Sequence, residues 1–135
     1  MFQGILQSSS IPALEQVVQF TQARHEVLAG NLANLHTPGY RARDLSVDDF
    51  QSRLRQAIDQ RNRPAPSSPG EPTQNTVPVA KVAENSKSIV FHDGSNIAVE
   101  QQVTEMVKNQ MEHNMAMTIL ASQFRLMQTA ISERV

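Results

Sequence analysis

The chain has 135 residues and a formal net charge of −1, and only 39% of its residues are hydrophobic and 4% aromatic. So little apolar and aromatic content argues against a thick globular core. The near-neutral charge offers no basic surface for nucleic acid or for a membrane, and the absence of cysteine excludes disulfides and thiolate chemistry.

The first eleven residues are polar and serine-rich and lack the basic and apolar regions of a secretory signal peptide. No apolar run approaches the ~20 residues that a transmembrane helix needs. We therefore expect neither a cleaved signal peptide nor a membrane span.

The segment 12–35 is predicted to form a long helix, because Pro12 suits a first helical turn and apolar residues then recur at spacings of four and three. This is the seam pattern of a coiled coil. The seam runs through Leu14, Val18, Thr21, His25, Leu28, Leu32 and Leu35. A second stripe lies roughly 160° around the helix and consists of Phe20, Ala23, Val27 and Gly30. Since one partner helix cannot cover both stripes, we expect a second packing face.

A turn motif ends this helix. Pro38 cannot continue a helix and Gly39 can adopt a positive φ, so the chain must turn here. Asn31 and Asn34 lie near the helix end, where they would either cap free backbone groups locally or contact another subunit. The motif comprises Asn31, Asn34, Thr37, Pro38, Gly39 and Tyr40, and the tyrosine is expected to pack its ring with the hydroxyl on a polar partner.

The middle of the chain divides in two. Residues 36–60 hold the turn and a short helix, Val47–Ile58, with Phe50, Leu54 and Ile58 on one face. Residues 61–96 read as an irregular proline-rich loop, in which Val77–Val82 and Ser88–Phe91 are candidates for two short strands of a β-hairpin.

The segment 97–133 is predicted to form a second long helix on which the heptad pattern returns. Its seam contains Val99, Val103, Met106, Gln110, His113, Met117, Leu120, Phe124, Met127 and Ile131. Met115, Ile119 and Leu126 lie opposite that seam and extend the second packing face. We therefore predict a mainly α fold of one domain, 1–135, in which the N- and C-terminal helices pair as an antiparallel coiled-coil-like hairpin.

No catalytic, cofactor or metal site can be assembled from the sequence. The four histidines do not form a metal-binding spacing such as His-Glu-x-x-His. His25 and His113 occupy seam positions, where a hydrogen-bonded polar residue that fixes the register is favoured over a metal ligand. His92 and Asp93 are better explained by a turn and a helix cap than by acid–base chemistry. We expect no enzyme activity.

The run from Asn31 to Tyr40 resembles the signature of the bacterial flagellar axial proteins of the rod and hook. The segment Asp93–Glu100 before a long helix, in a chain this short, is similar to the proximal rod members of that family. This resemblance implies a structural subunit that polymerises with its own copies and with other rod proteins, without nucleic acid. It also implies export by the flagellar type III apparatus, contact with the inner-membrane ring or export gate, and a place in the periplasmic rod. The alternative is a soluble coiled-coil adaptor or export chaperone that binds one helical partner.

The spacing of Phe50 and Leu54 resembles the hydrophobic export motif of early flagellar substrates, in which both residues are read by the export gate. Residues four apart share a helix face, so both side chains would enter one groove together. Simple packing inside the rod is an equal alternative, and Phe2 and Leu6 have the same spacing.

Overall fold

The computed structural model describes residues 9–62, 81–84, 88–90 and 99–132. It contains three helices and two strands in these residues: α2 (Ile11–Ala33), β1 (Arg43–Leu45), α3 (Val47–Asn62), β2 (Ser88–Val90) and α4 (Val99–Ser132). The three predicted helices are confirmed, although α3 runs four residues beyond the expected Ile58. Most of the proline-rich loop, Phe2 and Leu6, and the predicted cap around Asp93 lie outside the described residues.

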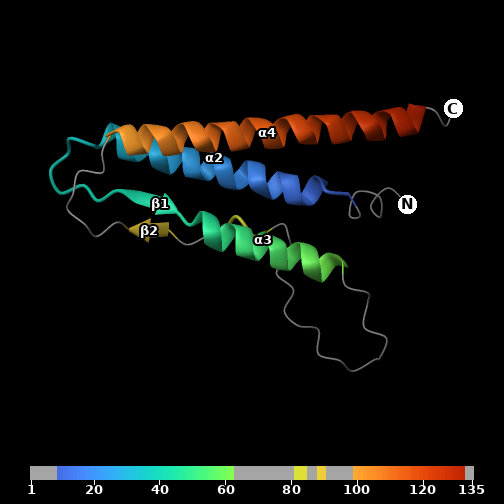
Figure 1. The fold of residues 1–135 in the computed structure, drawn as a ribbon, viewed down its shortest axis with the longest axis horizontal. Helices are drawn as coiled ribbons and strands as arrows, with labels where there is room; N and C mark the ends of the chain where they lie inside the picture. The colour runs from blue at the N-terminus through green and yellow to red at the C-terminus, as the bar shows by residue number, and fades with distance from the viewer. Residues whose placement is uncertain (1–8, 63–80, 85–87, 91–98, 133–135) are drawn as a thin grey trace, which may run out of the picture.

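The helix α2 is the central layer of the molecule (Figure 1). The helix α4 runs antiparallel along one side of it, while β1, β2 and α3 lie on the other side. Among the described elements α4 contacts α2 alone. The mainly α fold with two long paired helices is therefore confirmed, and α4 has one covered side.

The two strands form an antiparallel pair, but not the predicted hairpin. β2 pairs with β1, so that Arg43 lies opposite Val90 and Leu45 opposite Ser88. Val82 lies in a turn over residues 81–84, and the expectation that it belongs to a strand is wrong. Its side chain is completely buried. Its packing with the buried Phe20 and Phe50 holds this turn against the helices.

A small core fills the space between α2 and α3. Phe20 and Phe50 stack with ring centroids 4.0 Å apart and an interplanar angle of 6°, and both are buried. Ala57 and Val82 complete this cluster. Phe20 of the expected second packing face therefore packs against α3 of the same chain. The chain folds back after the turn and covers Phe20 of the second stripe, while Ala23 of the same stripe remains exposed.

The face of α4 that packs on α2 agrees with the predicted seam only in part, because Met106, His113, Leu120 and Met127 are half-buried. Its buried residues are Gln102, Asn109 and Ala116, which recur every seven positions, each one residue before a predicted seam position. The predicted seam residues Val103, Met117, Phe124 and Ile131 are instead exposed in the subunit. The physical reason is hydrogen bonding, because Gln102 and Asn109 bind polar groups of α2 and hold this face of α4 inward.

Candidate assembly surface and the polar network behind it

The turn motif closes α2 by local hydrogen bonds. Asn34 caps the helix, because its backbone N–H and its side-chain amide both donate to the Gly30 carbonyl, at 3.1 and 2.9 Å. Thr37 to Tyr40 then form a β-turn, in which the Tyr40 N–H donates to the Thr37 carbonyl at 3.2 Å. Gly39 has a φ of 77°, the left-handed value that the third residue of a type II turn requires.

The Asn31 side chain connects this turn to the neighbouring elements by hydrogen bonds. Its buried amide pairs with the backbone of Arg43, donating to the carbonyl and accepting from the N–H at 3.1 Å. The Tyr40 hydroxyl donates to the same Asn31 oxygen at 3.1 Å, as expected of a tyrosine with a polar partner. Asn31 also donates to Gln102 of α4 at 3.4 Å. One side chain therefore links α2, the turn, β1 and α4.

Arg24 forms a second polar junction, which sequence analysis missed. Its guanidinium binds Asp44 through two hydrogen bonds of 2.8 and 2.7 Å and Glu105 through one of 2.9 Å. These hydrogen bonds, above all those to Asp44, raise the pKa of Arg24 despite the opposing effect of its burial. Lys108 and then Arg24 lower the pKa of Glu105 by hydrogen bonding. Arg24 is the only lysine or arginine of α2, which is a signal that could have pointed to this site.

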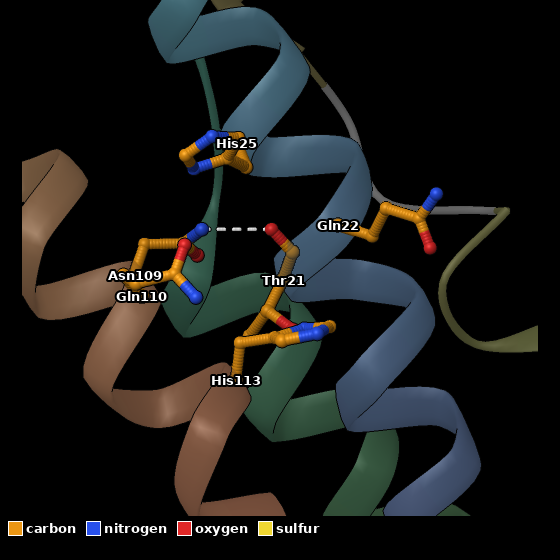
Figure 2. Close-up of a pocket in the computed structure, with 6 residues that line it drawn as sticks. All are labelled: Thr21, Gln22, His25, Asn109, Gln110 and His113. Atoms are coloured by element: carbon orange, nitrogen blue, oxygen red, sulfur yellow. Dashed lines mark hydrogen bonds between the residues drawn. The ribbon is translucent and has the colours of Figure 1, made fainter. Parts of the chain in front are cut away.

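A polar layer lies next along the helix pair (Figure 2). Asn109 donates to the Thr21 carbonyl at 2.7 Å. The Thr21 hydroxyl lies 2.9 Å from Val17 O, 3.0 Å from Val18 O and 2.9 Å from His113 Nδ1. A hydroxyl has a single proton, so when it donates to a helix carbonyl, His113 Nδ1 must be the donor. His113 is then a hydrogen-bonded register residue.

These side chains surround a pocket of about 140 Å³ between α2 and α4, lined by Thr21, Gln22, His25, Asn109, Gln110 and His113. His25 Nδ1 and Asn109 Oδ1 are buried beside it without a hydrogen-bond partner among the described residues. Figure 2 shows His25 and His113 on either side of the Asn109–Thr21 contact. The described residues contain no group of three side chains placed to bind a metal ion.

The opposite side of α4 carries many exposed apolar side chains that no described element covers. Apart from Tyr40, all large hydrophobic side chains that are exposed in the described residues lie on this helix. We call them the α4 surface: Val99, Val103, Val107, Met111, Met115, Met117, Ile119, Phe124, Leu126 and Ile131. No described helix combines the length and the hydropathy that a membrane span requires. The α4 surface is therefore the candidate assembly surface.

The other predicted site residues are distributed as follows. Leu28 of the N-terminal seam is buried, and Leu14, Val18, Leu32 and Leu35 are half-buried, as are Met106, Leu120 and Met127 of α4. On the second face of α2, Ala23 is exposed, and Val27 and Gly30 are half-buried. Phe50 of the candidate export motif is buried in the core, and Leu54 is half-buried against it. The structure thus brings both residues of the candidate export motif into one cluster.

Comparison with known proteins gives a consistent result. No protein-family model matches the chain. The flagellar basal body rod protein FlgB of Aquifex aeolicus is 30% identical over 105 residues, which cover 73% of each chain. FlgB of Escherichia coli is 27% identical over 126 residues, covering 87% of this chain and 88% of the relative. FlgB of Bacillus subtilis is 25% identical and covers 93% of this chain and 95% of the relative. With the turn motif and the paired terminal helices, these relatives show that the chain belongs to the FlgB family of flagellar basal-body rod proteins.

Proposed function

We propose that this rod protein polymerises through α4, packing against its own copies and other rod proteins in the periplasmic part of the flagellum. We further propose that it arrives there unfolded, exported by the flagellar type III apparatus without a cleaved signal peptide, and that it contacts the inner-membrane ring or export gate. The observation that carries the assembly proposal is the α4 surface, because a long helix that is apolar on its outer side is normally enclosed by protein.

The arrangement of the α4 surface favours more than one neighbour. Val99, Val103, Val107, Met111, Met115 and Ile119 follow one another at intervals of four residues. Each interval turns the side chain by about 40°, so the row sweeps about 200° around the helix. A straight partner helix covers only a narrow stripe. An α4 surface that is fully buried therefore needs neighbours on at least two sides.

This geometry distinguishes a rod subunit from the alternative, a soluble adaptor or export chaperone with one helical partner. Such a complex would stay monodisperse and would leave part of the apolar row in water. In addition, α4 extends beyond the N-terminal end of α2. His113 lies opposite Thr21 in this antiparallel pair, so Ile11, ten residues before Thr21, should lie opposite about residue 123. Roughly the last nine residues of α4, ~13 Å, then lack α2 as a support. Figure 1 shows the same overhang at the C-terminal end.

The assembly proposal is tested with Leu126→Glu, whose leucine is 64% exposed in the subunit. A charge here leaves the packing on α2 untouched but would be buried without a partner in the polymer, so we expect loss of sedimentable polymer and of motility. Gln128→Glu, an exposed polar position on the same helix, is the matched control and should assemble. Normal polymer formation by Leu126→Glu would contradict the proposal.

The export proposal concerns Phe50 and Leu54. Their spacing supports recognition by the gate, and their burial in the folded subunit means that such recognition must precede folding. Phe50→Ala with Leu54→Ala should therefore reduce secretion while intracellular levels persist, and the same change at Phe2 and Leu6 should have a smaller effect. The matched control is Phe20→Ala, which removes the same aromatic stack from outside the motif.

The control separates recognition from stability. If Phe20→Ala is secreted normally and the Phe50 and Leu54 variant is not, the loss of secretion cannot come from the weakened core. If both variants are secreted at the wild-type rate and fail only to build a rod, the two residues have a packing role and the export assignment is wrong.

A further inference from the structure

Two methionines are the most exposed large hydrophobic residues of the described chain. Met111 is 68% exposed and Met115 is 67% exposed. They lie four residues apart on the α4 surface, with Val107 and Ile119 continuing the same row. Residues at this spacing share a helix face, so the two thioethers form one neighbouring pair that water and small oxidants can reach.

The chemistry of a thioether makes this pair reactive. Hydrogen peroxide transfers one oxygen atom to the sulfur: the O–O bond breaks, an S=O bond forms, the sulfur is oxidised by two electrons and the peroxide leaves as water. The product is a polar sulfoxide in place of a flexible apolar side chain. Met106 and Met127 are half-buried, so they are less accessible to peroxide than Met111 and Met115.

We propose that Met111 and Met115 are a reversible oxidation site that controls assembly, an inference that rests on the proposed role of the α4 surface. In the subunit both side chains point into solvent, so their oxidation leaves the α2–α4 pairing intact. In the polymer the same side chains are buried, and a sulfoxide oxygen there lacks a hydrogen-bond donor. Peroxide would therefore block the addition of subunits without unfolding them. A thiol-dependent sulfoxide reductase would restore assembly: the S=O bond breaks, two thiols of the reductase are oxidised to a disulfide and the oxygen leaves as water.

The experiment treats the purified full-length protein with hydrogen peroxide and follows each methionine by peptide mass spectrometry. Met111 and Met115 should gain oxygen before Met106 and Met127. Far-UV circular dichroism of the subunit should not change, while the concentration needed for sedimentable polymer should rise by about tenfold or more, since a buried polar group without a partner disfavours assembly.

Variants assign the effect to this pair. Met111→Leu with Met115→Leu keeps the size and hydrophobicity of the side chains, so it should assemble normally without peroxide. After treatment it should be clearly less sensitive than the wild type, with the remaining sensitivity due to Met117 of the same surface. Met117→Leu is the matched control, because Met117 is 46% exposed elsewhere on α4, and this variant should stay sensitive to peroxide.

Three outcomes would overturn the inference: oxidised wild-type protein that assembles normally, equal oxidation of the half-buried methionines, or a leucine double variant that is as sensitive as the wild type. Failure of the untreated wild-type protein to assemble at any concentration is a separate result, which contradicts the assembly proposal itself and removes this inference with it.

Discussion

Replacing Arg24 by methionine tests the polar junction between α2, β1 and α4. Methionine retains much of the length of the side chain but removes the three hydrogen bonds to Asp44 and Glu105. The side chain of Arg24 is 6% exposed, whereas those of Asp44 and Glu105 are 17% and 30% exposed. In the variant, water can therefore reach only part of each of the two carboxylates that have lost their partner.

Removing one partner of a buried ion pair usually destabilises a protein by about 3–5 kcal/mol, and the partial exposure of both carboxylates places Arg24→Met near the lower limit, at about 3 kcal/mol. Glu105→Gln keeps a hydrogen-bond acceptor and changes the more exposed of the two carboxylates. It should therefore lower the free energy of unfolding by only about 0.5–1 kcal/mol. Asp44→Asn breaks the two-bond contact and should fall between these values.

The free energy of unfolding is measured by urea denaturation at neutral pH, followed by circular dichroism at one fixed protein concentration. Arg55→Met, at an exposed position on α3, is the matched control and should change stability by less than about 0.5 kcal/mol. An Arg24→Met variant that is destabilised no more than Glu105→Gln would contradict a structural role for the buried guanidinium. The double variant of Arg24 and Glu105 then measures the coupling between the two side chains directly.

Four further predictions follow from the same contacts. A Cβ added to Gly30 would lie 3.9 Å from the Tyr40 hydroxyl, which is an ordinary contact distance. Because alanine has the higher helix propensity, Gly30→Ala should stabilise the subunit by about 0.5–1 kcal/mol in urea denaturation, whereas the larger side chain of Gly30→Leu should displace Tyr40 and lose that gain. Gly39→Ala should destabilise the subunit by about 1 kcal/mol, because an alanine at a φ of 77° is strained although its Cβ meets no atom within 4 Å; an unchanged urea midpoint would contradict this. Because the pKa of Glu105 is lowered in the folded state, its ion pairs stabilise the fold fully above pH 4.5, the ordinary pKa of a glutamate. This stabilisation is lost as the pH falls through the folded-state pKa, so Glu105→Gln should make the free energy of unfolding less dependent on pH in the acid range. The end of α4 that extends beyond α2 should gain helix with rising concentration as polymers form, while the paired part of α2 and α4 stays folded. A helix content by circular dichroism that does not depend on concentration would favour the adaptor alternative.

The extent of the helices and the turn could be predicted from sequence because their signals are local. Apolar spacing, Pro38 and Gly39 act within a few residues, and the structure places α2 and the β-turn where these residues require them. The partner of β2 could not be predicted, since it lies more than forty residues earlier in β1 and no local pattern identifies it. The burial of Phe20 by Phe50 was missed for the same reason.

The packing face of α4 was mispredicted for a different reason, which bears on how the subunit works. A prediction from hydrophobic periodicity places apolar residues inside. In this structure Gln102 and Asn109 are buried, while valines and methionines on other faces of α4 are exposed. Buried polar contacts specify register and orientation at some expense in stability. A subunit joined by hydrogen bonds from Asn31, Arg24 and Thr21 can align α4 in one register on α2 before any neighbour arrives. Its hydrophobic side chains then remain available for assembly, where the burial of apolar surface supplies the larger driving force. The polarity that misleads a pattern-based prediction for the isolated chain is therefore what a subunit needs if it must fold first and polymerise afterwards.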